Sequence, residues 1–142
     1  MVISKIYSSQ QGKSKLLPFY DLVVHAGFPS PAEDHSDLSL DLNDYLVKHP
    51  AATFYVYAKG DSMINSGIYD GDLMIVDRSL DPKSNSIVIA VIDGEFTVKK
   101  IKKINSKLYL QPNNALYKPI QITSNMDFII WGIVTYVIHK PQ

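Results

Sequence analysis

Six runs of β-branched and aromatic residues follow one another between residue 52 and residue 138, and each is bounded by Gly, Pro, Asn or Asp. Side chains of these types pack well on a pleated surface, so runs of this length and composition are typical of β-strands. In chain order they read ATFYVYA, DLMIVD, SIVIAVI, EFTVKKI, KLYLQ and DFIIWGIVTYVI. The pattern predicts a domain that is mostly β.

The dipeptide Asp93-Gly94 predicts how two of these runs are connected. It separates residues 86–92 from residues 95–101, and an Asp-Gly pair suits the type I′ turn of a two-residue hairpin. The runs IVIAVI and FIIWGIV are continuously apolar, which is typical of strands that are buried on both faces. We therefore expect a compact, folded-over or barrel-like sheet.

The N-terminal quarter of the chain has a different pattern. Residues 1–37 lack sustained periodicity, and residues 27–34, GFPSPAED, combine Gly, two Pro and acidic residues, as extended exposed chain does. We expect an arm over residues 1–37 and a β-rich domain over residues 38–142. One short helix is predicted within residues 41–48, with Asp41 as its N-cap.

The composition excludes several classes of protein. The chain has 142 residues, of which 46% are hydrophobic, enough for one globular domain with its own core. It contains 0 Cys, so neither disulfides nor a thiolate metal site can stabilise it. We expect no metal and no cofactor. The formal net charge of +0 provides no overall field that would attract nucleic acid.

The chain shows no sign of a membrane span or of export. No apolar stretch approaches the length that a membrane-spanning helix needs. Residues 16–24 resemble the apolar part of a secretory signal, but Pro18 and Asp21 interrupt them. A cytoplasmic protein is the expectation.

Ser62 is a candidate nucleophile. In the stretch AKGDSMI it follows the predicted strand at residues 52–58 through Lys59, Gly60 and Asp61. A hydroxyl on such a turn can project from a rigid support while nearby backbone N–H groups stay free to bind an oxyanion. The alternative is a turn serine that bonds its own backbone. The motif is not the G-x-S-x-G elbow of α/β-hydrolases.

A nucleophilic serine needs a base, and lysine is the better candidate here. The four histidines, none of which has a convincing position in the sequence, are His25, His35, His49 and His139. Lys99 and Lys100 lie near the end of the run EFTVKKI, and a lysine removed from water can take a proton from serine as the neutral amine. Alternation sends the two lysines to opposite faces without choosing between them. Both can instead belong to a solvated basic edge with the lysines that follow.

Several motifs together resemble the LexA/UmuD family of self-cleaving Ser–Lys peptidases. In chain order they are GFPSPAED, GDSMI, DGDLMIVD, IVIAVIDGEFTVKK and LQPNNALYKPI, and the similarity runs from about residue 22 to about residue 137. In that family the serine of G-D-S-M is the nucleophile and the first lysine of F-T-V-K-K is its base. The resemblance therefore implies Ser62 as nucleophile and Lys99 as general base.

The resemblance also implies a cleavage bond within the arm. Members of the family cut themselves between a small residue and a glycine just before F-P-S-P, which here is the bond between Ala26 and Gly27. UmuD-like members often carry Cys-Gly and LexA-like members Ala-Gly, so Ala26 departs modestly from the UmuD pattern. Residues 1–21 match poorly. The stretch before the cleavage bond is expected to have no room for a helix-turn-helix domain, which argues against a repressor.

The resemblance further implies partners. A RecA filament on single-stranded DNA would stimulate cleavage, and the truncated homodimer would join a UmuC-like Y-family polymerase for error-prone translesion synthesis in the SOS response. Direct sequence-specific DNA binding is not expected. Two alternatives stay open: a LexA-type or phage-type repressor fragment with the same chemistry, and a non-catalytic β module that its arm regulates. Whether cleavage acts within one chain or across a dimer is also open.

Overall fold

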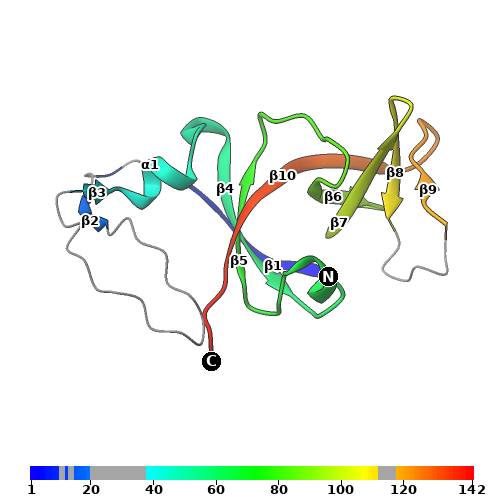
Figure 1. Ribbon diagram of the computed structural model, residues 1–142. Helices are drawn as coiled ribbons and strands as arrows, with labels where there is room; N and C mark the ends of the chain where they lie inside the picture. The colour runs from blue at the N-terminus through cyan, green and yellow to red at the C-terminus, as the bar shows by residue number, and fades with distance from the viewer. Residues whose placement is uncertain (10–11, 13–14, 20–37, 112–117) are drawn as a thin grey trace, which may run out of the picture. The chain divides into compact units, whose positions relative to one another are not determined.

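The computed structural model describes residues 1–9, 12, 15–19, 38–111 and 118–142 (Figure 1). The chain divides into two compact units, one of Met1–Gln10 with His49–Gln142 and the other of Gln11–Lys48. The residues of the expected cleavage bond, Ala26 and Gly27, lie outside the described residues.

The larger unit contains a closed antiparallel barrel of six strands (Figure 1). Its sheet has the order β1-β4-β5-β10-β6-β7-β8-β9, and an additional pairing of β1 with β7 closes the barrel. The strands are β1 (Val2–Ser8), β4 (Thr53–Lys59), β5 (Leu73–Asp77), β6 (Ile87–Ile92), β7 (Glu95–Ile104), β8 (Lys107–Gln111), β9 (Ile120–Gln121) and β10 (Phe128–Ile138). Strands β8 and β9 extend the sheet beyond β7.

The mostly β fold with a barrel-like sheet is confirmed. Each of the six predicted runs forms a strand within one or two residues of its expected ends, apart from β7, which continues to Ile104. The hairpin of β6 and β7 also forms, with Ile92 opposite Glu95. At its turn Asp93 has a φ of 50° and Gly94 a φ of 80°, as a type I′ turn requires of both central residues.

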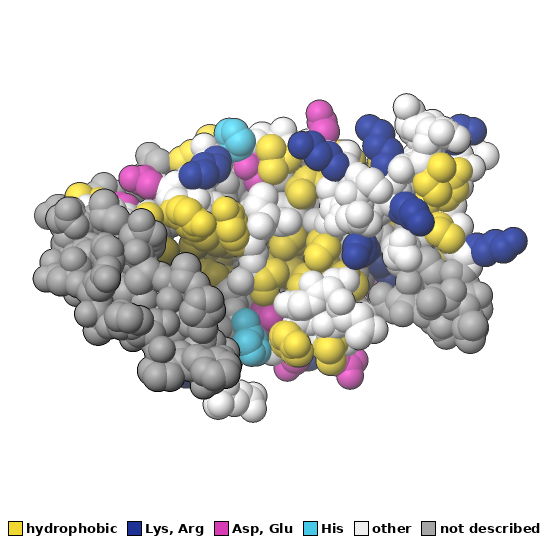
Figure 2. Space-filling view, in the orientation of Figure 1, with side chains coloured by type: hydrophobic (Ala, Val, Ile, Leu, Met, Phe, Trp, Pro, Cys, Tyr) yellow, Lys and Arg dark blue, Asp and Glu magenta, His cyan; other side chains and the backbone are white. Residues whose placement is uncertain are grey.

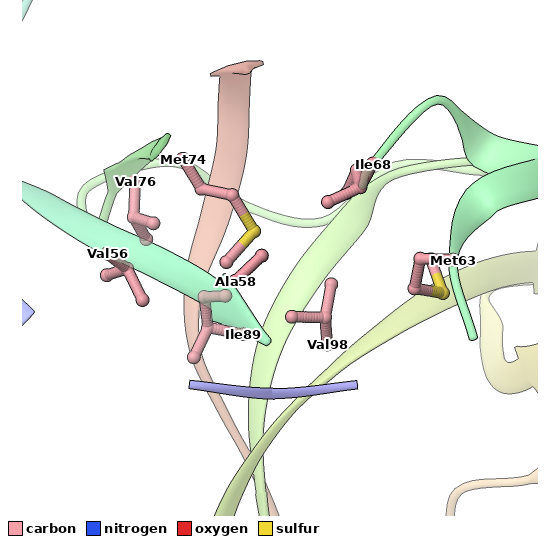
Figure 3. Close-up of a cluster of buried hydrophobic side chains, with 8 residues drawn as sticks. All are labelled: Val56, Ala58, Met63, Ile68, Met74, Val76, Ile89 and Val98. Atoms are coloured by element: carbon pink, nitrogen blue, oxygen red, sulfur yellow. The ribbon is translucent and has the colours of Figure 1, made fainter. Parts of the chain in front are cut away.

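Two buried clusters form the core. The first, shown in Figure 3, contains Val56, Ala58, Met63, Ile68, Met74, Val76, Ile89 and Val98. The second contains Val88, Ala90, Ile101 and Ile133. Apolar side chains in both clusters are removed almost completely from water, which is the main favourable contribution to folding.

Burial of the run FIIWGIV on both faces is only partly correct. In β10 the buried residues are Gly132 and Ile133, whereas Ile129 is 60% exposed. Its neighbours Phe128 and Ile130 pack against the second cluster, so alternation along the strand directs Ile129 to the opposite face. The run is continuous in sequence, but this end of the strand has only one covered face.

Gly132 allows β10 to approach β5 closely. A Cβ at this position would lie 2.6 Å from Val76 Cγ1 and 3.2 Å from Arg78 Cγ, the first of which is far inside a van der Waals contact. The pairing of β10 with β6 is irregular between Ile130 and Gly132, as in a β-bulge, so the strand changes register here. The glycine therefore lies where backbone and side chain have no room for a methyl group.

Strand β1 comes from the stretch that the sequence predicts to be an arm. Six of its residues pair with β4, from Val2 opposite Lys59 to Ser8 opposite Phe54, and Val2 also pairs with Thr97 of β7. The pairing with β4 shifts register between Ile3 and Lys5, which matches the lack of a regular period in this segment. The division into an arm at residues 1–37 and a domain at residues 38–142 stays a prediction.

The smaller unit contains the predicted short helix. Strand β2 (Leu17–Phe19) pairs with β3 (Leu38–Leu40), and α1 (Leu42–Leu46) follows. The Asn43 N–H donates to the Asp41 carboxylate at 2.9 Å, so Asp41 caps the helix as expected. Among the described residues, none of the helices has the length and apolar character that crossing a membrane requires.

Candidate active site

Ser62 lies on the turn that follows β4. Gly60 has a φ of +103°, a conformation that favours glycine, and its N–H donates to the Asp70 carboxylate at 2.7 Å. Met63 is only 3% exposed and belongs to the first core cluster, and a 3-10 helix, Ile64–Ser66, comes next. The turn is thus fixed on both sides of Ser62, while Ser62 itself is exposed.

Lys99 lies in β7, opposite Val88 of β6, and is partly buried. Its neighbour Val98 is 1% exposed and belongs to the first core cluster, together with Met63. Figure 3 shows both of these core residues. The residues next in sequence to Ser62 and to Lys99 are therefore parts of one packed cluster.

The amino group of Met1 connects the two candidates. It donates a hydrogen bond to the Ser62 hydroxyl oxygen. Burial lowers the pKa of this α-amine, and the positive charge of Lys99 lowers it further, while Asp61 acts in the opposite direction. Ser62 thus accepts a hydrogen bond from the Met1 nitrogen, and the charge of Lys99 contributes to lowering the pKa of the same group. Figure 1 shows the N-terminus beside the segment that follows β4.

Two residues of β7 hold Met1 in this position. The Thr97 hydroxyl donates to the Met1 carbonyl oxygen at 2.7 Å, and the Val98 N–H donates to the same oxygen at 3.3 Å. Side chains alternate along a strand, so Thr97 and Lys99 share one face of β7 and Lys100 takes the other. The hydroxyl that donates to the Met1 carbonyl oxygen therefore belongs to the face of β7 that carries Lys99.

Two of the four histidines contact buried carboxylates instead. His49 Nδ1 lies 2.5 Å from the Asp77 carboxylate, and His139 Nδ1 lies 2.6 Å from the Asp72 carboxylate. The other two, His25 and His35, lie outside the described residues. In the part of the chain that the structure describes, no three His, Cys, Asp or Glu side chains are grouped as a metal site would need.

The alternative of a solvated basic edge applies to the lysines that follow Lys99 and Lys100. Lys102, Lys103 and Lys107 are exposed, whereas Lys99 and Lys100 are partly buried. Figure 2 shows Lys and Arg side chains gathered over the end of the barrel that carries β7 and β8. The two lysines that were candidates for a base thus differ from the rest of the cluster in exposure.

Sequence reasoning did not identify Met1 and Thr97 as part of this site. They are 96 positions apart, and the contact between them depends on β1 filling the space beside β7. Thr97 belongs to the F-T-V-K-K motif, but the motif gives it no chemical role, and Met1 belongs to no motif, so the sequence carried no local signal for their contact.

A serine on a fixed turn after β4 and a partly buried lysine on β7, the two strands on either side of β1 in a small β-barrel, are the residue types of a serine hydrolase with a lysine base. The profile of the Peptidase S24-like family matches residues 18–135. The chain belongs to this family of serine peptidases, and its resemblance to the LexA/UmuD family is confirmed.

Named relatives agree with this assignment. The chain is 43% identical to Protein ImpA of Salmonella typhimurium over 135 residues, which is 91% of this chain and 88% of ImpA. It is 38% identical to Protein MucA of Escherichia coli over 137 residues, 96% of this chain and 93% of MucA. The LexA repressor of Stenotrophomonas maltophilia is 43% identical over 110 residues, 78% of this chain but 52% of the repressor. These similarities support an SOS-related role.

Proposed function

We propose that this protein is a UmuD-type peptidase that cleaves its own chain between Ala26 and Gly27, with Ser62 as the nucleophile and Lys99 as the general base. The observation that carries the proposal is the Met1 amine, which donates to the Ser62 hydroxyl and whose pKa the Lys99 charge lowers. A group that bonds the nucleophile and lies within the electrostatic influence of the base occupies the kind of position that a substrate atom needs.

The reaction follows the usual course of acyl transfer. The neutral amine of Lys99 accepts the Ser62 hydroxyl proton as the oxygen attacks the carbonyl carbon of Ala26, and the Ser62 backbone N–H stabilises the oxyanion. The C–N bond then breaks, and the Lys99 ammonium gives its proton to the departing amine of Gly27. Water hydrolyses the Ser62 ester, which restores the hydroxyl and leaves residues 1–26 and 27–142.

The choice of Lys99 over Lys100 has support from the face of β7. Thr97 bonds the Met1 carbonyl oxygen from the face that alternation gives to Lys99. Lys100 lies between Ile87 of β6 and Gln111 of β8 and takes the opposite face. A base must come within hydrogen-bond reach of the hydroxyl, and the contact of Met1 with both Ser62 and Thr97 supports the lysine on the Thr97 face.

The substrate is part of the same polypeptide, so no turnover is expected. Because the bond and the catalytic groups are tethered, docking supplies a high effective concentration. A partner that binds the docked state more tightly than the undocked state accelerates cleavage. In this proposal the partner is a RecA filament on single-stranded DNA, and the truncated homodimer then serves a UmuC-like Y-family polymerase.

Mass measurement after incubation tests the proposal. The purified chain is incubated with and without an activated RecA filament, and the products are identified by intact mass. The expected result is a pair of fragments of residues 1–26 and 27–142, formed faster with the filament. A chain that stays intact in both incubations, or that is cut at another bond, contradicts the proposal.

A further inference from the structure

The Met1 end of β1 lies over the candidate nucleophile. Strand β1 runs antiparallel to β4 along the whole of that strand and reaches β7 through the pair Val2–Thr97. We call the position that β1 fills between β4 and β7 the strand site. The strand site holds an extended chain by main-chain pairing on one side and by the Thr97 hydroxyl and the Val98 N–H on the other.

Occupation of the strand site also engages the Ser62 hydroxyl. An ammonium group is a donor only, so the hydroxyl accepts this bond with an oxygen lone pair. Attack on a carbonyl carbon needs a free lone pair and space beside the oxygen, and the Met1 amino group takes one of the two lone pairs and part of that space. A Cβ added at Gly60 would meet Met1 Cα at 3.7 Å, so Met1 also lies against the turn that carries Ser62. With β1 in place, Met1 thus occupies space beside the Ser62 hydroxyl that an approaching carbonyl group would need.

We propose that the strand site is a binding site for an extended polypeptide strand, that residues 1–8 are its resident occupant, and that they must leave before the Ala26–Gly27 bond can reach Ser62. The inference rests on the proposed function. In it, residues 1–8 compete with the Ala26–Gly27 bond for access to Ser62. Residues 1–8 precede the bond in the same chain, so the competitor and the substrate are tethered to the same barrel.

Competition of this kind sets the cleavage rate. Only chains whose strand site is empty react, so the observed rate is the intrinsic rate multiplied by the fraction of empty sites. The competitor is held by β4 and β7 together and so closes the barrel. Release of β1 therefore exposes the edges of both strands, and cleavage afterwards separates residues 1–8 from residues 27–142.

An engineered disulfide tests the proposal in the full chain. Lys5 and Tyr57 are directly opposite in the β1–β4 pair, and both are exposed. Opposite residues of antiparallel strands have Cα atoms about 4.5–5.5 Å apart, which is within the range of a disulfide. The chain contains 0 Cys, so the double variant Lys5→Cys/Tyr57→Cys offers only one intramolecular pairing. Oxidation locks β1 in the strand site and reduction frees it.

A matched pair on another hairpin provides the control. Lys102 and Tyr109 are directly opposite in the β7–β8 pair, so Lys102→Cys/Tyr109→Cys exchanges the same two residue types without touching β1. Each oxidised protein is compared with its own reduced form in the incubation with the RecA filament. The expected result is an uncut chain for oxidised Lys5→Cys/Tyr57→Cys, cleavage after reduction, and equal rates for both forms of the control.

Two outcomes overturn the inference. One is failure of the Lys5→Cys/Tyr57→Cys disulfide to form while the control disulfide forms, because β1 is then not in the strand site. The other is cleavage of the locked protein as fast as its reduced form. Absence of cleavage in the unsubstituted chain and in every reduced variant overturns the proposed function instead. Disulfide formation then still reports whether β1 occupies the strand site.

Discussion

Met63 and Val98 belong to the same buried cluster, although 34 residues separate them and each is next in sequence to a candidate catalytic residue. Core packing thus fixes the backbone at Ser62 and at Lys99 with respect to each other, since a close-packed interior tolerates little displacement. The relative position of Ser62 and Lys99 therefore depends on the packing of this cluster, while the Ser62 hydroxyl remains outside it.

Removal of either candidate should abolish cleavage without unfolding the protein. We expect Ser62→Ala and Lys99→Ala to stay uncut in the RecA incubation, whereas Lys100→Ala is still cleaved. Ser62 is exposed, so its replacement should change the free energy of unfolding by about 0.5 kcal/mol or less. Intact mass gives the cleavage result and urea unfolding gives the stability. Loss of cleavage in the Lys100 variant alone would reverse the assignment of the base.

Cleavage should become faster as the pH is raised. The proposed base works as a neutral amine, and the fraction of any amine that is neutral increases with pH. The measurement is the initial rate of fragment formation by the purified chain, without the filament, at several pH values above 8.0, where the Met1 amine no longer makes the docking of β1 depend on pH. Circular dichroism at each pH serves as the control for folding. A rate that is flat across this range contradicts a lysine base.

Docking of β1 in the strand site should become more favourable as the pH rises to 8.0. The docked amine of Met1 has its pKa lowered from 8.0, so the docked state binds fewer protons than the undocked state. The penalty for docking a charged amine is therefore fully present below the lowered pKa and disappears as the pH rises to 8.0. Hydrogen-exchange protection of β1, corrected for intrinsic exchange, should increase across this window. An acetylated N-terminus should show no such increase, and equal pH dependence in both forms would contradict the assignment.

Replacement of Gly132 should destabilise the barrel. An alanine methyl group would lie 2.6 Å from Val76 Cγ1, so β10 and β5 must move apart. Overpacking of this kind costs about 1–3 kcal/mol, measurable as a lower urea midpoint for Gly132→Ala. Gly12→Ala is the matched control, because a Cβ there meets nothing within 4 Å. Equal stability of the two variants would show that the β5–β10 contact accommodates the methyl group.

Asp77 should contribute stability that is lost in acid. Burial opposes its charged form, but hydrogen bonds from Ser79 and His49 outweigh burial and lower the pKa of Asp77 below 3.8. Because the folded-state pKa is depressed, this stability is present above pH 3.8 and is lost as the pH falls through the folded value. We expect Asp77→Ala to lose about 1–3 kcal/mol at neutral pH, and less in strong acid. Urea unfolding at several pH values measures this, with exposed Asp81→Ala as control. A loss independent of pH would contradict the ionic contribution.

The local elements could be predicted because each has a short-range cause. The strand runs have the branched and aromatic side chains that a pleated surface favours, Asp93-Gly94 has the residues that tolerate positive φ, and Asp41 offers an oxygen to the N–H of Asn43. The motifs around Ser62 and Lys99 likewise stand in the sequence. Fold class, the hairpin, the helix and the candidate residues therefore needed no tertiary information.

Only the tertiary structure determined which strands pair and which distant residues contact one another. Strand β1 has no regular period, so only its pairing with β4 and β7 identifies it as the strand that closes the barrel. The same pairing carries Met1 to Ser62, 61 positions away. Periodicity also left the two lysines equivalent, and the hydrogen bond from Thr97 to Met1 supports the proposal of Lys99. Side-chain period and turn chemistry act over a few residues, whereas strand partners are selected by the packing of the whole barrel.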